Sequence, residues 1–152
     1  MILEIRKTHP DDLTEIANAE ALIFSDPWTR ADILNILSSE GAMCYTAKKD
    51  GKVIAYIVGR TVIPEGEIYR IATLPEYRGR GVAYRLLDFA VKTERGSGLE
   101  SLFLEVRKNN LPARALYASY GFTEIGIRKN YYKNPTDDAI VMLFASKSDI
   151  QG

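Results

Sequence analysis

The spacing of hydrophobic residues alternates between helical and strand-like periods along the chain. A short alternating strand over 2–6 precedes a stretch from 13 to 24 in which apolar residues recur at helical intervals. Asp26-Pro27 ends this helix, because the residue before a proline avoids helical backbone angles. Thr29-Arg30-Ala31-Asp32 then provides a capping signal for a second, short helix, which we expect to end near Gly41.

The period changes to two in the middle of the chain. Strands expected over 42–48 and 53–61 flank Asp50-Gly51, a dipeptide that tolerates the positive φ of a tight hairpin turn. A third strand follows over 67–74, and a helix is expected over 82–94. Residues 99–106 are almost unbroken in their apolar character, which indicates a strand buried on both faces.

A final helix and two strands complete the pattern. The helix covers about 110–120, and the strands cover 122–127 and 139–144. The order β-α-α-β-β-β-α-β-α-β-β predicts an α+β fold in which one mixed central sheet is flanked by helices. Because the sequence holds no repeat and no Pro/Gly/Ser-rich linker, we expect residues 1–152 to form a single domain.

Composition indicates the cellular compartment in which we expect the protein. Hydrophobic residues make up 46% of the 152 residues and charged residues 26%, as in soluble globular proteins. No apolar run is long enough to span a bilayer, and the first residues lack the pattern of a signal peptide. A lone cysteine, Cys44, suits a reducing compartment. We therefore expect a cytoplasmic protein with no membrane partner.

Charge and metal-ligand content disfavour two further classes. The 20 basic and 20 acidic residues balance, whereas a general nucleic-acid binder carries a basic excess, so no nucleic-acid partner is expected. One histidine and one cysteine make a zinc site improbable, and no metal is expected. Catalysis would have to come from carboxylates, tyrosines, backbone dipoles or a bound cofactor.

A glycine-containing segment joins the strand over 67–74 to the helix over 82–94. It reads Arg78-Gly79-Arg80-Gly81-Val82-Ala83. Glycines let successive backbone amides point into one concavity, and the start of a helix adds partial positive charge, so a diphosphate would suit the segment. Arg78 and Arg80 can add charge-assisted contacts. The alternative is a basic, flexible loop without a ligand, but the position between a strand and a helix favours phosphate binding.

These motifs resemble the GNAT acetyltransferases, and within them the ribosomal-protein-alanine N-acetyltransferases. The pyrophosphate loop of that superfamily has the pattern Gln/Arg-x-x-Gly-x-Gly/Ala, which here is Arg78-x-x-Gly81-x-Ala83. Further matching segments are Leu104-Glu105-Val106-Arg107, Asn110, Ala115-Leu116-Tyr117, Tyr120-Gly121-Phe122, Arg128-Lys129-Asn130-Tyr131-Tyr132 and Asp138-Ala139-Ile140-Val141-Met142. The similarity is dense from Glu67 to Leu143 and thinner before.

The resemblance implies transfer of an acetyl group from acetyl-CoA to a primary amine. It implies the N-terminal alanine of a ribosomal protein as acceptor and direct attack within a ternary complex. We expect a monomer or weak dimer. The cofactor would enter a splay between the strands over 67–74 and 99–106, with the oxyanion at a backbone amide near Ile71 or Ala72. The residues implied in holding acetyl-CoA are Ile71, Ala72, Thr73, Arg78, Gly79, Arg80, Gly81, Val82, Ala83, Tyr84 and Asn110.

Glu105 lies in the otherwise apolar segment 102–106. A carboxylate there is costly to bury unless it is paired, and desolvation would make it a stronger base. Alternatively, it pairs with Arg107 or points to solvent at the end of the strand. In the family that the chain resembles, this glutamate is the proton acceptor, so the resemblance implies a general base.

Tyr117 lies on the helix that follows. Taken alone, it indicates a core aromatic residue with a satisfied hydroxyl. The resemblance implies instead a general acid for the departing thiolate, since a phenol of pKa about 10 can donate to a thiolate of pKa about 8.5 with little loss of driving force.

Two further positions could shape an acceptor site. Tyr131 and Tyr132, expected between the last two strands, would either bind the acceptor peptide or form a bulge that packs its own rings. Glu20 lies on the apolar stripe of the first helix, and a local partner is expected for it rather than the acceptor amine.

Two other functions stay open on the sequence. An acetyltransferase for lysine or a small-molecule amine would carry an acidic acceptor pocket in place of a tyrosine-lined groove. A non-catalytic acyl-CoA-binding module would have no need of Glu105 and Tyr117 together.

Overall fold

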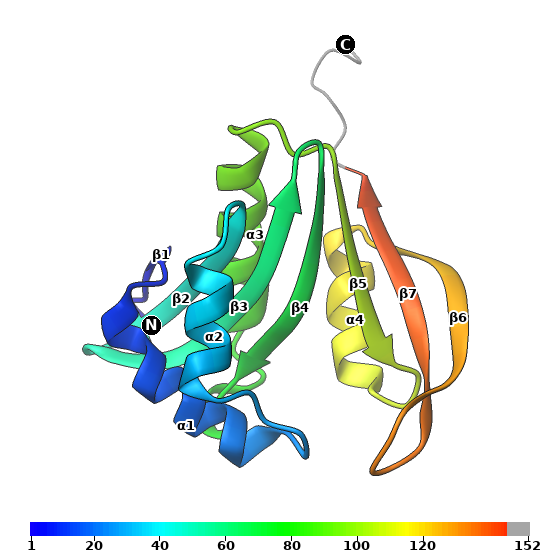
Figure 1. The fold of residues 1–152 in the computed structure, drawn as a ribbon, viewed down its shortest axis with the longest axis horizontal. Helices are drawn as coiled ribbons and strands as arrows, with labels where there is room; N and C mark the ends of the chain where they lie inside the picture. The colour runs from blue at the N-terminus through cyan, green and yellow to red at the C-terminus, as the bar shows by residue number, and fades with distance from the viewer. Residues whose placement is uncertain (146–152) are drawn as a thin grey trace.

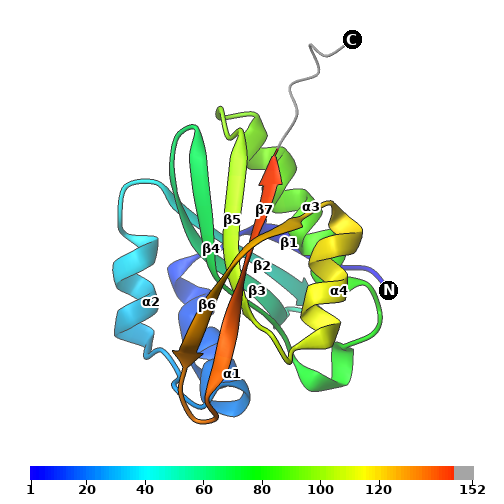
Figure 2. The same cartoon turned by 90° about the vertical axis from the view of Figure 1, so that its right-hand side faces the viewer.

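Within residues 1–145, seven strands form one mixed sheet, with two helices on each face (Figures 1 and 2). The computed structural model describes residues 1–145, and residues 146–152 of the expected domain lie outside the described part. The strands are β1 (Glu4–Lys7), β2 (Ala42–Lys49), β3 (Lys52–Val62), β4 (Glu65–Thr73), β5 (Ser101–Arg107), β6 (Thr123–Tyr132) and β7 (Asp137–Ala145). The helices are α1 (Leu13–Ile23), α2 (Arg30–Leu37), α3 (Val82–Arg95) and α4 (Leu111–Tyr120), with short 3-10 turns over Pro10–Asp12 and Pro75–Tyr77. The predicted α+β class and element order are confirmed.

The strands lie in the order β1-β2-β3-β4-β5-β7-β6. All neighbours are antiparallel except β4 and β5, which are parallel and are connected through α3. The β2–β3 hairpin turns at Asp50 and Gly51, whose φ angles of 51° and 79° are those of the tight turn that the sequence predicts.

The helices divide the core into two layers (Figure 2). One layer packs α3 and α4 against the sheet and includes Leu86, Leu102 and Leu104. The other packs α1 and α2 against the opposite face and includes Leu13 and Ile33. Among residues 1–145, no helix combines the length and the apolar character needed to cross a membrane.

Strand β5 is buried on one face only, so the prediction of burial on both faces is wrong. Leu102, Leu104 and Val106 are buried, whereas Phe103 and Glu105 between them are partly exposed. The reason is the position of the helices: α3 and α4 cover one face of β5, while α1 and α2 on the other face lie over β2 and β3. A polar residue can therefore occupy the uncovered face.

Glu20 is completely buried, and its main partners come from distant strands rather than from its own helix. Its Oε2 accepts a hydrogen bond of 2.6 Å from the Tyr56 hydroxyl. Its Oε1 accepts from the Trp28 amide at 3.0 Å and from Arg70 Nε at 3.2 Å. The expectation of a local partner is thus corrected: the carboxylate fastens the end of α1 to β3 and β4.

Candidate active site

Strands β4 and β5 pair over only half of their length. Their register runs from Glu65 opposite Ser101 to Ile68 opposite Leu104 and stops there. Beyond this point β4 continues along β3, and β5 continues along β7 (Figure 1). The register of β4 against β3 shifts next to Ile68, and such a bulge bends a strand away from its former direction. The splay that the resemblance implied is therefore present.

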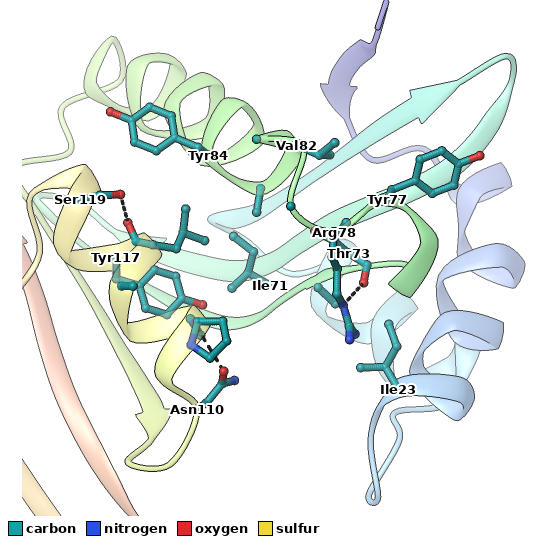
Figure 3. Close-up of a pocket in the computed structure, with 18 of the residues that line it drawn as sticks. Ile23, Ile71, Thr73, Tyr77, Arg78, Val82, Tyr84, Asn110, Tyr117 and Ser119 are labelled. Atoms are coloured by element: carbon teal, nitrogen blue, oxygen red, sulfur yellow. Dashed lines mark hydrogen bonds between the residues drawn. The ribbon is translucent and has the colours of Figure 1, made fainter.

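A cavity of about 660 Å³ lies between the splayed part of β4 and the helices α3 and α4 (Figure 3). We call it the α3–α4 cavity. It brings together ten of the eleven residues predicted to hold a cofactor, namely Ile71, Ala72, Thr73, Arg78, Gly79, Gly81, Val82, Ala83, Tyr84 and Asn110. Arg80 is not part of the lining, and its guanidinium lies 5.6 Å from the centre of the Tyr77 ring.

The loop before α3 has the backbone of an anion site. Gly79 and Gly81 have φ angles of +78° and +77°, which L side chains rarely adopt. A Cβ at either position would meet nothing within 4 Å, so glycine serves the backbone conformation and leaves open space above the loop. The first amides of α3 have no acceptor within the helix, and its first turn carries no acidic residue. The loop and the helix dipole thus suit a diphosphate.

The exposed edge of β4 offers backbone groups to the same cavity. The Leu74 amide donates to the Ile54 carbonyl on β3 at 2.8 Å. Because backbone groups alternate in direction along a strand, those of Thr73 and Ile71 face the gap instead. The Thr73 carbonyl accepts from Arg78 Nε at 3.1 Å (Figure 3). By the same alternation, the Ile71 amide faces the gap.

Asn110 ends the cavity at the start of α4. Its Oδ1 accepts from the Ala113 amide at 3.2 Å and so caps the helix (Figure 3). The side-chain oxygen is thereby occupied, and the side-chain NH₂ is the group left to contact a ligand.

A second cavity, of about 470 Å³, continues from the gap between β4 and β5. We call it the β4–β5 cavity. Glu105, Arg107 and Tyr132 line it. The residues that line both cavities are Ile23, Phe24, Ile71, Asn110, Ala113 and Tyr117. The two cavities therefore meet at the place where the sheet is parted.

Glu105 is paired, but not with Arg107. Its Oε2 lies 2.5 Å from Nε of Arg128, in an ion pair without hydrogen-bond geometry. Only 19% of the Glu105 side chain is exposed, against 61% of the Arg128 side chain. Arg107 instead donates to the carbonyls of Pro135 and Lys133, so it shapes the β6–β7 hairpin.

Tyr117 is 5% exposed and borders both cavities, with its hydroxyl directed into the α3–α4 cavity (Figure 3). Burial, and to a smaller extent Tyr132, raises its pKa above the ordinary value for a phenol. The hydroxyl is therefore protonated at neutral pH, and it is a weaker acid than an unperturbed tyrosine.

Tyr131 and Tyr132 lie at the end of β6, not between the last two strands as predicted. The register of β6 against β7 shifts between Arg128 and Tyr132, and Asn130 within the shift has a φ of 51°. The two rings meet edge to face at 5.1 Å. Tyr132 lines the β4–β5 cavity, whereas Tyr131 lies outside the lining and is 49% exposed.

Sequence reasoning missed three residues around the cavities. Phe24 lines both, Arg70 lines the β4–β5 cavity, and Arg128 pairs with Glu105. The Arg70 guanidinium lies 4.0 Å from the centre of the Phe24 ring and donates to the Asp26 carbonyl at 2.8 Å. These contacts join segments that are far apart in the chain, so no local sequence pattern predicts them.

Comparisons with known proteins agree on one family. The model of the acetyltransferase (GNAT) family matches residues 11–122. The ribosomal protein bS18-alanine N-acetyltransferase of Haemophilus ducreyi is 33% identical over 135 residues, which cover 86% of this chain and 89% of the relative. The N-alpha-acetyltransferase RimI of Mycobacterium tuberculosis is 36% identical over 137 residues, with coverage of 86% and 85%. Among solved structures, the ribosomal-protein-S18-alanine N-acetyltransferase of Escherichia coli has a TM-score of 0.89 at 29% identity and covers 97% of this chain and 96% of its own.

Proposed function

Because the chain belongs to the GNAT acetyltransferase family and is an N-acetyltransferase, we propose that it acetylates the N-terminal alanine of ribosomal protein bS18 with acetyl-CoA. The activity is the one for which the relatives are named. The observation that carries the proposal is the parted sheet, where the α3–α4 cavity and the β4–β5 cavity share six lining residues. An acyl donor and an amine can then approach one point from two sides.

The α3–α4 cavity fits acetyl-CoA, which supplies an activated thioester carbonyl. The amides that follow Gly81 and the loop from Arg78 would hold the diphosphate. The gap-facing groups of Ile71 would bind the amide-containing arm, and the Ile71 amide is the donor best placed to stabilise an oxyanion. The NH₂ of Asn110 would add a contact at the end of the arm.

Glu105 would act as the general base. An α-amino group has a pKa of about 7.7–8.0, against about 10.4 for lysine, so an N-terminal acceptor gives up its proton more readily. The mostly buried carboxylate in the β4–β5 cavity accepts that proton, directly or through water. Tyr132 in the same lining would contact the acceptor peptide.

Tyr117 would donate to the departing thiolate. Its raised pKa keeps the proton on the phenol until negative charge develops on sulfur. Full transfer is less favourable than for an unperturbed tyrosine, so the hydroxyl contributes first as a hydrogen-bond donor to that charge. With base and acid on opposite faces of the sheet beside the gap, no covalent enzyme intermediate is required.

A peptide panel that differs at the first residue tests the acceptor. Peptides that begin with alanine, serine or methionine are compared with one that has a blocked N-terminus and an internal lysine. We expect the fastest acetylation of the alanine peptide and none at lysine. Preferential acetylation of lysine would contradict the proposed acceptor.

Two substitutions test the residue roles. Glu105→Gln and Tyr117→Phe should each lower kcat by about 10²-fold or more, the typical contribution of a general base or acid. Glu124→Gln and Tyr120→Phe serve as controls, since Glu124 pairs with Arg114 on the surface and the Tyr120 hydroxyl donates to Asp88. Near-wild-type rates in both test variants would refute the pair.

Two-substrate kinetics test direct attack. If both substrates must be bound together, double-reciprocal plots at several acetyl-CoA concentrations intersect. Parallel lines, which indicate a ping-pong reaction through an acetylated enzyme, would contradict the ternary complex.

A further inference from the structure

Arg128 competes for the carboxylate that the acceptor amine needs. Its Nε lies 2.5 Å from Glu105 Oε2, at the point where a cationic amine would have to bind before it loses a proton. A carboxylate held by a guanidinium is a weaker base than a free one. The pair seen in the free protein must therefore open before Glu105 can accept a proton.

Arg128 is not held like a structural arginine. Its side chain is 61% exposed and reaches Glu105 from β6, the edge strand of the sheet. The strand bulges just after it, and its guanidinium lies 5.7 Å from the centre of the exposed Tyr131 ring. Arg107, by contrast, is fixed by two backbone carbonyls. Exposure and position leave Arg128 able to move.

A second carboxylate stands next to the pair. Glu67 on β4 lies opposite Phe103, two residues before Glu105 on β5, so both carboxylates project from the same face of the sheet. Glu67 is exposed, and it makes no ion pair with another residue of the described range 1–145. Partial desolvation by the neighbouring chain, then the charge of Glu105, raises the pKa of Glu67, while Arg128 opposes that rise. The three charges thus act on one another.

Several other groups border Glu105. Tyr131 and Tyr132 lie on β6. The charge of Glu105 is the main cause that raises the pKa of Tyr131, whereas burial, followed by that charge, raises the pKa of Tyr132. The remaining titratable or charged groups around the cavity are Arg107 on β5, Tyr69 and Arg70 on β4, Tyr117 on α4 and Asp26 in the α1–α2 loop. Among the cations, Arg70 donates hydrogen bonds to Glu20 and to the Asp26 carbonyl, and Arg107 donates to carbonyls of the β6–β7 hairpin. Arg128 is the cation that contacts the base.

We propose that Arg128 is a displaceable counter-ion of Glu105. When the ammonium group of the acceptor binds Glu105, the guanidinium of Arg128 moves to Glu67. This inference rests on the proposed function. The incoming ammonium takes the place of the guanidinium on Glu105, and one proton then passes from nitrogen to the carboxylate. Arg128 is in this sense a positioning residue. A neutral hydroxyl cannot displace the guanidinium, so the device selects acceptors that arrive as cations.

Removal of the counter-ion should favour acceptor binding. In Arg128→Gln the ammonium no longer has to break an ion pair, so the KM for the peptide falls by about 2- to 5-fold, the range set by the strength of exposed ion pairs. Without the cation, protonation of the carboxylate becomes easier, and the acid limb of the kcat/KM profile moves to higher pH. Lys129→Ala, which removes the neighbouring exposed cation paired with Asp138, is the matched control.

Removal of Glu67 should do the opposite. In Glu67→Gln the guanidinium has no second partner, so the peptide KM rises by about 2- to 5-fold. Loss of a nearby negative charge moves the acid limb to lower pH. In the double variant Arg128→Gln/Glu67→Gln, the effect of Glu67→Gln on KM should vanish, because there is no guanidinium to transfer.

The wild-type rate on the alanine peptide is measured first, so that the two ideas can fail separately. An inactive wild type on that peptide overturns the acceptor, and the variants are then measured on the amine of the panel that is acetylated. An active wild type with additive effects in the double variant, or with unmoved acid limbs, overturns the displacement of Arg128. A purely structural role for Arg128 would lower the melting temperature and leave the acid limb where it is.

Discussion

Replacement of Tyr56 by phenylalanine removes a single oxygen from the interior. The Tyr56 side chain is 1% exposed, and its hydroxyl donates to Oε2 of Glu20, which is 0% exposed, at 2.6 Å. The substitution keeps the ring, so the packing of β3 against α1 is retained. What is lost is one of three hydrogen bonds to a buried carboxylate, the others coming from Trp28 and Arg70.

The size of the effect follows from that geometry. A hydrogen bond to a charged group contributes about 1.5–3 kcal/mol, and Glu20 is 0% exposed, so bulk solvent does not reach the carboxylate to replace the lost bond. For a chain of this length each kcal/mol shifts the melting temperature by about 2–4 °C, so Tyr56→Phe should melt about 3–12 °C lower.

Urea denaturation and calorimetry of the wild type and Tyr56→Phe measure the change. Tyr69→Phe is the control, because this tyrosine is 40% exposed and its replacement should stay within about 0.5 kcal/mol. A loss in Tyr56→Phe no larger than that of the control would show that Glu20 does not depend on the hydroxyl, and the role assigned to the buried carboxylate would be wrong.

Three further predictions follow from other parts of the fold. Burial alone would raise the pKa of Asp12, but hydrogen bonds from Arg6, the His9 amide and Lys48 lower it. The contribution of the Asp12 carboxylate to the stability of the fold is therefore complete above the unfolded pKa of about 3.9 and is lost as pH falls through the lowered pKa of the folded state. Asp12→Asn should lower the free energy of unfolding at pH 7 by about 1–3 kcal/mol and flatten its fall below about pH 5, as measured by urea denaturation across pH. Gly81→Ala, at a φ of +77° with free space around the new Cβ, should lose about 1–2 kcal/mol and raise the KM for acetyl-CoA. Leu104→Ala, at a side chain 1% exposed, should lose about 2–5 kcal/mol in the same assay.

Contrary outcomes are equally definite. An Asp12→Asn protein with an unchanged acid transition would mean that the ion pairs do not persist in solution. An unaltered acetyl-CoA KM in Gly81→Ala would argue against the loop as the diphosphate site, and a loss below about 1 kcal/mol in Leu104→Ala would place that side chain outside a rigid core.

Local sequence signals predicted local structure well. Thr29 and Asp32 form the expected capping box, with hydrogen bonds of 3.1 and 2.8 Å, and Asp50-Gly51 forms the expected turn. Each of these depends on a few consecutive residues. The glycine loop before α3 was also found from its own pattern, since positive φ angles and a helix start are properties of the segment itself.

Features that depend on contacts between distant segments could not be predicted from the sequence. The apolar run over 99–106 predicts a strand buried on both faces, because the sequence does not say which face of the sheet the helices cover. The bulge near Asn130 depends on the register between β6 and β7, and Glu20 finds its partners on β3 and β4. The partner of the proposed base, Arg128, comes from another strand as well. The hydrophobic period shows which positions are apolar. Which side chains contact one another across the sheet depends on the order and register of the strands.

The four residue pairs that join β4 to β5 are the seam between two half-sheets, β1–β4 and β5–β7. A seam so short leaves the halves coupled through little backbone, and a molecule wedged beyond it touches both at once. Its binding free energy then stabilises the association of the two half-sheets. Saturation with acetyl-CoA should therefore make their unfolding more cooperative. It should also slow amide exchange at Ile71, which lies on the open side of the seam.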